Sequence, residues 1–298
     1  MMNRRDFGLS FGASVLLSRR ARAGVSLPTP VARLRALEQA TGGRLGAFVL
    51  DTGSGHSFGW RFDERFCHCS TFKLSLAAMA LRASDAGHLD LMEPLPFSKE
   101  DIIAYSPVVE KNLARGSLPI LKLAEAVQIT SDNAAANVLM RRLGGPAAVT
   151  RFWREIGDKT SRLDSYEPDV NVIPPGTEKN STTPQAMAET VRKIVLGDVL
   201  SATSREQLRG WMAATQSGRN RIRAGIPDSW RGLDKTGTGM RPGIGNKTND
   251  LAVLLPPDDR SPLIVIGYFE TPVFSENIRP EDESVLRTLG EIAVRWDA

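Results

Sequence analysis

The sequence predicts an α+β protein in which both ends of the chain share one antiparallel sheet of about five strands, while the middle forms an all-helical region. Three observations lead to this fold class. A helix and a strand hairpin open the chain, helix-forming segments fill its middle, and apolar strands with a last helix close it. With 298 residues, 41% of them hydrophobic, the chain can bury one or two domain cores.

Residues 1–23 have the composition of an export signal. Arg4-Arg5 precede an apolar segment that ends at Leu17, and Ala21-Arg22-Ala23 forms an Ala-x-Ala cleavage pattern. Paired arginines are typical of twin-arginine export in bacteria. The alternative, an amphipathic anchor, is disfavoured because the apolar run is too short to span a bilayer. We therefore expect a mature chain of residues 24–298 that is periplasmic or secreted.

Removal of this leader also removes the basic excess of the chain. Residues 1–23 carry five arginines and one aspartate, a net charge of +4, so the formal charge of +4 becomes 0 in the mature chain. Nucleic acids and anionic membranes attract proteins with a basic excess. We therefore expect neither as a partner of the mature protein, and we expect it to be a monomer. No later stretch is apolar for long enough to predict a membrane-spanning helix.

The first elements follow from periodicity. Apolar residues at helical spacing predict a helix over residues 31–40, and Gly42-Gly43 would end it. Residues 45–50 predict a strand, and a Gly-rich turn leads to a second strand near residues 56–61. This hairpin needs further strands to complete a sheet.

Residues 70–81 predict a buried helix, because helix formers with apolar groups occupy every face. Ser70 and Lys73 stand in its first turn and share one face. Burial and the positive end of the helix dipole both disfavour the charged form of Lys73. A neutral amine beside a hydroxyl would activate a serine nucleophile. On spacing alone, the alternative in which Ser70 caps the helix and Lys73 extends to solvent is favoured.

The rest of the middle also predicts helices, over residues 121–129, 133–143, 184–196 and 204–214. Ser131-Asp132 would begin the second of these and Gly144-Gly145-Pro146 would end it, while Thr183 and Ser204 are available as caps for the last two. Residues 158–183 contain three prolines and no clear period. A loop of this length inside a compact domain is usually functional or disordered.

Three apolar segments near the end of the chain predict strands, and an amphipathic segment predicts the last helix. Their ranges are 230–238, 250–255, 263–270 and 285–296. If these strands join the first hairpin, residues 24–62 and 215–298 form an α/β lobe and residues 63–214 form an all-α lobe. The cleft between two such lobes is a common place for a small-molecule site.

Four local patterns stand in order along the chain. They are Ser70-x-x-Lys73, Ser131-Asp132-Asn133, Glu167-Pro168-x-x-Asn171 and Lys235-Thr236-Gly237. Each could occur by chance, but their combination resembles the signature of the class A serine β-lactamases. The resemblance extends from about residue 28 to the C-terminus, and it implies an α/β lobe, an all-α lobe and an active site between them.

The residues themselves suggest a chemistry. Ser70 would attack a carbonyl group, and its backbone N–H together with that of Thr238 would form an oxyanion hole for the tetrahedral intermediate. Ser131 can pass a proton to a leaving nitrogen. Lys235 would supply a fixed positive charge for an anionic substrate.

The resemblance implies a substrate and its contacts. The substrate would be a penicillin- or cephalosporin-type β-lactam, whose ring carboxylate the segment Lys235-Thr236-Gly237-Thr238 would hold. Asn133 would contact the side-chain amide of the substrate. Arg221 either supports the carboxylate site or is an ordinary surface arginine. Tyr105 either lines the mouth of the cleft or packs against the protein. We expect no cofactor and no metal ion.

Glu167 would complete the reaction. An acyl-enzyme on Ser70 must be hydrolysed, which requires a water molecule and a base. In the family a glutamate on an omega-shaped loop acts with an asparagine, and these match Glu167 and Asn171. The alternative, a solvated loop carboxylate, is disfavoured by Pro168 and the correctly spaced Asn171. Lys73 and Glu167 are both assigned as acid/base groups, because either could be the base for acylation.

Two positions depart from the family pattern. Many members close the neck of the loop with an arginine–aspartate salt bridge, but Ser165 and Asn180 stand at those positions. We expect a neutral hydrogen bond, or Arg162 with another acid, to hold the neck, and we expect a more mobile loop.

The two cysteines are a second departure. Cys67 and Cys69 are two positions apart, which is poor geometry for a disulfide, so we expect buried thiols rather than a strained pair. Some carbapenem-hydrolysing members link a cysteine at the position of Cys69 to one at the position of Gly239, and that link cannot form here. A metal site at Cys67-His68-Cys69 is disfavoured because three adjacent residues rarely give closed zinc geometry.

Two other functions fit part of the pattern. A penicillin-binding D,D-peptidase shares the chemistry of Ser70, Lys73 and Lys235 but lacks the deacylating glutamate. A non-catalytic β-lactam sensor module would remain acylated and continue into a membrane-spanning signalling segment. Glu167 argues against the first function, and the lack of such a segment argues against the second.

Overall fold

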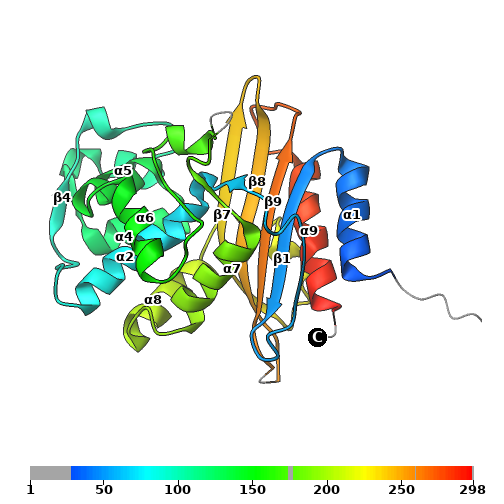
Figure 1. Ribbon diagram of the computed structural model, residues 1–298. Coiled ribbons are helices and arrows are strands. Elements are labelled where there is room, and N and C mark those ends of the chain that lie inside the picture. The colour runs from blue at the N-terminus through cyan, green and yellow to red at the C-terminus, as the bar shows by residue number, and fades with distance from the viewer. Residues whose placement is uncertain (1–27, 174–176, 259, 297–298) are drawn as a thin grey trace, which may run out of the picture.

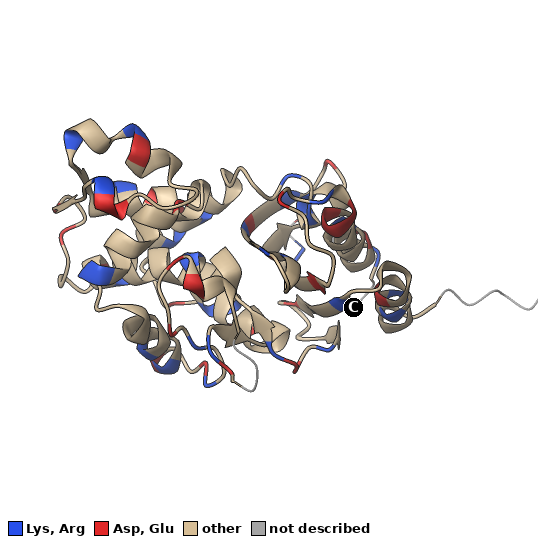
Figure 2. Cartoon of the chain, turned by 90° about the horizontal axis from the view of Figure 1, so that it is seen from above, with Lys and Arg blue, Asp and Glu red and all other residues tan. Residues whose placement is uncertain are grey.

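The computed structural model describes residues 28–173, 177–258 and 260–296. Figure 1 shows a helical lobe beside a five-stranded antiparallel sheet that carries helices of its own. The strand order is β2-β1-β9-β8-β7, which confirms the predicted fold class. Charged residues are spread over both lobes (Figure 2). The export signal expected over residues 1–23 lies outside the described part of the chain.

The five strands of the sheet are β1 (Arg44–Asp51), β2 (Ser57–Trp60), β7 (Arg231–Arg241), β8 (Gly245–Leu255) and β9 (Leu263–Thr271). Two short strand pairs lie outside it, β3 (Phe66–Cys67) with β6 (Ser181–Thr182) and β4 (Pro94–Pro96) with β5 (Ser117–Pro119). The α-helices are α1 (Pro30–Thr41), α2 (Phe72–Asp85), α3 (Pro107–Lys111), α4 (Ile120–Ile129), α5 (Asn133–Arg142), α6 (Pro146–Glu155), α7 (Pro184–Val191), α8 (Ala202–Ala213) and α9 (Pro280–Val294). Short 3-10 segments are η1 (Cys69–Thr71), η2 (Lys99–Asp101), η3 (Leu113–Arg115), η4 (Asp169–Asn171) and η6 (Ile222–Gly225), and η5 (Arg192–Leu196) is a π-helical turn. None of the helices in the described ranges combines the length and the apolar character needed to cross a membrane.

The sheet separates two hydrophobic cores, because successive residues of a strand point to opposite faces. Along β1, Ala47 and Val49 join the core beneath α1 and α9, whereas Phe48 and Leu50 join the larger core that extends into the helical lobe. β7 is the edge strand beside the helical lobe (Figure 1). The Lys235-Thr236-Gly237 motif on β7 therefore lies at the boundary between the lobes.

The predicted helix after Ser70 is buried in the helical lobe, but it begins with a 3-10 turn. Ser70 lies in η1, and the α-helix starts at Phe72. Such turns are frequent at the N-termini of α-helices. No side-chain capping bond is present at this start, and Lys73 is fully buried. The alternative of a capping serine with a solvated lysine is therefore wrong.

Two further details differ from the sequence prediction. Helix α6 was not predicted, because Pro146 was expected only to end the preceding helix. Pro146 instead lies in the first turn of α6, where the N–H that proline lacks would have no partner within the helix. Ser201 rather than Ser204 caps α8, since Ser201 Oγ accepts a hydrogen bond from the Ser204 N–H at 3.2 Å. Thr183 caps α7 as predicted.

The neck of the loop is closed by neutral hydrogen bonds around Asn180. Asn180 Oδ1 accepts from the N–H groups of Asp164 at 2.9 Å and Ser165 at 3.1 Å, and Nδ2 donates to Ser165 Oγ at 3.2 Å. Asp164 Oδ2 accepts from the Asn180 N–H at 3.0 Å and also from Arg162 Nε at 3.0 Å. Among the described residues, both neutral hydrogen bonds and an ion pair of Arg162 with Asp164 thus hold the neck, as the two expected alternatives.

The mobility of this loop stays a prediction. Net stabilisation by a neutral hydrogen bond is only about 0.5–1.5 kcal/mol, so we expect amides of residues 165–172 to exchange hydrogen faster than those of β8. Asn180→Ala should accelerate this exchange further, whereas Ser165→Ala, which leaves the backbone contacts of Asn180 intact, should have a smaller effect. Hydrogen exchange followed by mass spectrometry tests this. Equal protection of the loop and β8 would contradict the expectation.

His68 is a buried histidine directly before the turn that carries Ser70. Its ring stacks on Trp153 with 4.9 Å between ring centroids. Neither ring nitrogen has a hydrogen-bond partner among the described residues. Burial lowers the pKa of His68 to about 4, and the attraction of Asp158 offsets this only in part.

This lowered pKa predicts acid sensitivity of the fold. An unfolded histidine has a pKa of about 6.5, so between pH 6.5 and pH 4 the unfolded chain binds more protons at this site, and stability falls as the pH falls. From pH 7.5 to pH 5.0 the loss from His68 should be about 2 kcal/mol. Urea unfolding at both pH values should show a smaller loss for His68→Phe, which keeps an aromatic ring against Trp153. His88→Phe, at an exposed position, is the control. An equal loss in the two variants would contradict the assignment.

Candidate active site

Lys73 lies at the centre of the site. Its Nζ donates to Ser70 Oγ and to the backbone oxygen of Ser131, each at 2.9 Å, and also to Asn133 Oδ1. Glu167 Oε1 lies 2.9 Å from the same nitrogen, and both charged side chains are fully buried. Ser70 Oγ donates to Glu167 Oε1 at 3.3 Å. The fold therefore brings three of the four predicted motifs into direct contact around the Nζ atom of Lys73.

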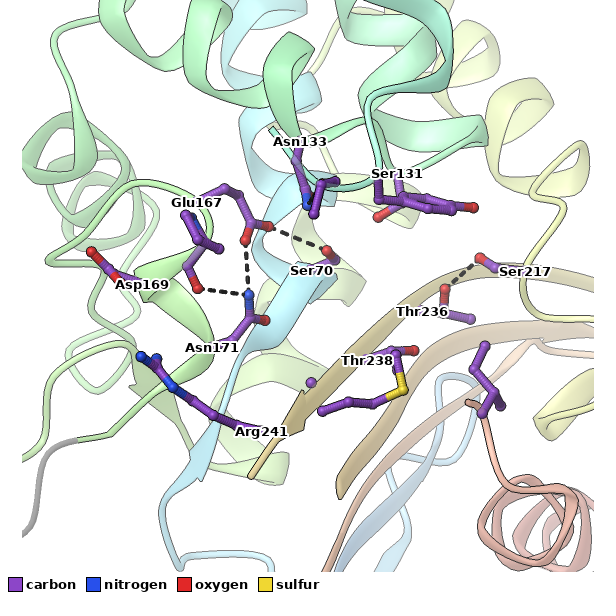
Figure 3. Close-up of a pocket in the computed structure, with 16 residues that line it drawn as sticks. Ser70, Ser131, Asn133, Glu167, Asp169, Asn171, Ser217, Thr236, Thr238 and Arg241 are labelled. Carbon is purple, nitrogen blue, oxygen red and sulfur yellow. Dashed lines mark hydrogen bonds between the residues drawn. The ribbon is translucent and has the colours of Figure 1, made fainter. Parts of the chain in front are cut away.

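Two asparagines hold Glu167 in place. Asn137 on α5 accepts from the Glu167 N–H at 2.9 Å and donates to the Glu167 backbone oxygen at 3.0 Å. Asn171 Nδ2 donates to Glu167 Oε2 and to the backbone oxygen of Pro168, each at 2.9 Å (Figure 3). Sequence reasoning missed Asn137. Its position four residues after Asn133 places both side chains on one helix face, and that spacing could have revealed it.

Lys235 connects β7 to the same network. Its Nζ donates to Ser131 Oγ at 3.1 Å and to the backbone oxygen of Thr236 at 2.9 Å. Burial lowers the pKa of Lys235 to about 7, and the nearby ammonium of Lys73 lowers it further. A positive charge on Lys235 for an anionic substrate stays a prediction, and complete burial makes that charge depend on pH near neutrality.

Three residues around the site adopt left-handed backbone conformations. The φ angles are 45° at Cys69, 62° at Tyr105 and 61° at Ser131. Non-glycine residues rarely adopt such angles, and structures keep them where surrounding contacts impose them. Asp132 supplies such contacts, because its carboxylate accepts from the N-terminus of α5 at 2.8 Å and from the N–H groups of residues 108–109 at 2.7 and 3.0 Å.

A cavity of about 420 Å³ opens beside Ser70 (Figure 3). Its lining includes the predicted residues Ser70, Tyr105, Ser131, Asn133, Glu167, Asn171, Thr236 and Thr238. It also includes Pro168 of the Glu167 motif and residues that the sequence did not suggest, namely Ala104, Asp169, Ser217, Gly239, Met240, Arg241 and Ile278. Alternate residues of a strand share a face, so Met240 could have been inferred from Thr236 and Thr238. Lys73, Lys235, Gly237 and Arg221 stand behind this surface.

Ser70 and Thr238 border the cavity from opposite lobes, Ser70 from η1 and Thr238 from the edge strand β7. An oxyanion hole formed by their backbone N–H groups stays a prediction. A Cβ atom added to Gly237 would lie 2.8 Å from the backbone oxygen of His68. The absence of a side chain at Gly237 therefore allows β7 to approach the turn that carries the serine.

Arg221 is completely buried, so the surface alternative is wrong. Its guanidinium donates to Thr238 Oγ1 at 2.7 Å and to the backbone oxygens of Gly237 at 3.0 Å and Asn249 at 2.8 Å, and it pairs with Glu283 at 3.2 Å. A side chain with no exposed surface cannot contact a substrate directly. Its assignment as a binding residue is therefore corrected to a support for Thr238.

Tyr105 and Asn133 have different surroundings at the cleft. Tyr105 is 62% exposed and lines the cavity, so the packing alternative is wrong. Asn133 Nδ2 donates to the backbone oxygen of Ala104 at 2.8 Å, while its Oδ1 accepts from Lys73. A contact of Asn133 with a substrate amide stays a prediction.

Cys67 and Cys69 are buried free thiols, as expected. A hydrogen bond between them lowers the pKa of Cys67 and raises that of Cys69. Cys67 Sγ also donates to the backbone oxygen of Val170 at 3.3 Å. A Cβ atom added to Gly239 would lie 3.0 Å from Cys69 Sγ, so these two positions face each other. Within the described ranges, no three His, Cys, Asp or Glu side chains gather as metal ligands would.

Known proteins share both the sequence and the fold. Residues 29–296 match the beta-lactamase enzyme family. Beta-lactamase L2 of Stenotrophomonas maltophilia is 39% identical over 99% of both chains, and Beta-lactamase CTX-M-8 of Citrobacter amalonaticus is 42% identical over 80% of both. A crystal structure of a beta lactamase from Burkholderia vietnamiensis, 43% identical, superimposes with a TM-score of 0.85 over 92% of this chain and 98% of that one.

An ancestral beta-lactamase of class A, 44% identical, matches 89% of this chain and 99% of its own with a TM-score of 0.83. The family match covers nearly the whole described chain, and the relatives are covered over most of their length. The β-lactam-hydrolysing activity and the antibiotic resistance associated with these enzymes therefore apply to this protein. The chain belongs to the β-lactamase enzyme family, and within it to the class A serine β-lactamases.

Proposed function

We propose that this β-lactamase acts through a Ser70 acyl-enzyme, which is hydrolysed by a water molecule that Glu167 activates. One observation carries this mechanism. The buried carboxylate of Glu167 contacts the groups proposed for both acylation and deacylation. Its Oε1 contacts Ser70 Oγ and Lys73 Nζ, while its Oε2 accepts a hydrogen bond from Asn171.

Acylation begins with attack of Ser70 Oγ on the lactam carbonyl carbon. Glu167 can take the hydroxyl proton directly, since its Oε1 lies 3.3 Å from Oγ. Lys73, 2.9 Å from Oγ, can take it only after its own proton has passed to Glu167 across their 2.9 Å contact. The backbone N–H groups of Ser70 and Thr238 stabilise the oxyanion of the tetrahedral intermediate. The intermediate collapses as the lactam C–N bond breaks, and Ser131 delivers a proton to the nitrogen. Lys235, which donates to Ser131 Oγ, can replace that proton.

Deacylation uses the other side of the cavity. Glu167 takes a proton from a water molecule, which attacks the ester carbonyl carbon. Glu167 then returns this proton to Ser70 Oγ as the ester C–O bond breaks. Asn171 Oδ1 is buried and has no hydrogen-bond partner among the described residues, so it offers an acceptor that can orient this water. Asn137 keeps the carboxylate in range through the Glu167 backbone.

The substrate carboxylate would bind beside β7. Thr236 and Thr238 line the cavity, Lys235 lies behind them, and Arg221 fixes the hydroxyl of Thr238. An anionic substrate stabilises the ammonium form of Lys235 and so counteracts the burial that lowers its pKa to about 7.

Steady-state hydrolysis of a chromogenic cephalosporin by the mature protein tests this function. Repeated turnover is expected. Acylation of one equivalent without turnover would contradict the proposal and would favour a D,D-peptidase or sensor-like site.

Two substitutions separate the steps. Ser70→Ala should give no adduct, because it removes the nucleophile. Glu167→Gln keeps an acceptor for Lys73 but removes the base, so deacylation should slow by about 10²- to 10⁴-fold and an acyl-enzyme should accumulate. Mass spectrometry of the protein with substrate detects the adduct. Asp169→Asn removes a carboxylate from the same cavity and is the matched control. Full turnover by Ser70→Ala or Glu167→Gln would contradict the assigned roles.

Residues 1–23 would direct the enzyme to the periplasm as a twin-arginine signal, where the mature chain would act as a monomer. Arg4-Arg5 before a short apolar segment supports this route. Arg4→Lys/Arg5→Lys should greatly reduce periplasmic β-lactamase activity in a bacterium that expresses the full chain. Arg19→Lys/Arg20→Lys, which preserves the first pair, should retain most of it. Equal export of both variants would contradict a twin-arginine route.

A further inference from the structure

A second cavity, of about 410 Å³, lies on the helical lobe near the neck of the loop, away from Ser70. Its charged lining residues are five cations, Arg65, Arg151, Arg154, Lys159 and Arg162, and two carboxylates, Asp164 and Glu178. The lining thus carries a net charge of +3, although the mature chain as a whole has a formal charge of 0.

Only some of these cationic side chains have partners within the protein. Arg65 pairs with Glu178 at 2.9 Å, and Arg154 donates to backbone oxygens, including that of Ser161 at 2.8 Å. Arg151 and Lys159 have no hydrogen-bond or ion-pair partner among the described residues. The cavity therefore retains two uncommitted positive charges.

Arg162 is the third cation available to a ligand. It uses Nε and Nη2 for the carboxylate of Asp164, which leaves Nη1 without a partner in the described part of the chain. A guanidinium can bind two acceptors at once because its N–H groups form a rigid fork. Arg162 can therefore keep its contact with Asp164 and also bind an anion in the cavity.

We propose that this cavity binds a small tetrahedral oxyanion with two negative charges, of the phosphate or sulfate type. Such an ion offers several acceptor oxygens to the Arg and Lys side chains that line this cavity. Arg151, Lys159 and Arg162 are its ligands. Chloride is a poor substitute, because it has one charge and cannot span separate donors.

The same site is connected to the catalytic loop. Asp164, the partner of Arg162, accepts from the Asn180 N–H and donates its own N–H to Asn180 Oδ1. A bound anion shares Arg162 with Asp164, so its effect should reach the neck of the loop that carries Glu167.

Amide NMR of the full mature protein tests the site without any need for activity. Sodium phosphate, sodium sulfate and sodium chloride are titrated separately at constant ionic strength. Amide signals of Thr160, Leu163 and Ser165 should shift and saturate with phosphate or sulfate but not with chloride. Comparison of the phosphate and sulfate titrations shows which of the two oxyanions binds more tightly.

Two variants with the same change in charge distinguish binding in this cavity from non-specific electrostatic attraction of anions to the protein. Arg151→Gln/Lys159→Gln should weaken oxyanion binding at least about tenfold, since it removes two charge-assisted contacts. Arg33→Gln/Lys111→Gln removes the same total charge outside the lining of this cavity, at a half-buried and an exposed position, and should leave the affinity unchanged. Saturable binding whose affinity falls only in Arg151→Gln/Lys159→Gln supports the proposal. Equal weakening in both variants, chloride shifts of the same size, or no saturation would overturn it. Thermal unfolding of both variants confirms that they are folded.

Discussion

The site depends on the buried ion pair between Lys73 and Glu167. Neither side chain has access to solvent, so each charge relies on the other and on the polar groups around them. Removing one partner of a buried pair is strongly destabilising, because the remaining charge is left uncompensated. The pair also joins a helix of one lobe to the loop that borders the cleft. The same contact therefore holds the loop against α2 and places the Glu167 carboxylate within hydrogen-bond distance of Ser70 Oγ.

Backbone contacts make this arrangement specific. Asn137 binds both the N–H and the carbonyl oxygen of Glu167, so the loop is positioned by α5. Asp132 binds both its own helix and residues 108–109, directly after Ser131, whose backbone is left-handed. These contacts use helix and loop backbone groups that would otherwise need water.

The neck of the loop shows how an ionic link can be replaced. Asn180 uses its amide oxygen for two backbone N–H groups and its amide nitrogen for Ser165, while Arg162 and Asp164 form an ion pair beside it. When both partners of an ion pair change together, no unpaired charge remains, and the cost can be small. Here the change also leaves an arginine at the edge of a basic cavity, close to the catalytic loop.

The sequence alone determined the fold class and the enzyme family. Strand periodicity predicted the sheet, and the spacing of Ser70 and Lys73 predicted a shared helix face, because both properties are local. Only the tertiary structure decided that Arg221 is buried behind Thr238 and that the pKa of Lys235 falls to about 7. Burial and neighbouring charge come from residues far apart in the chain, and no local pattern records them. The basic cavity is likewise a product of folding, since its cations come from separate segments that only the packed structure brings together.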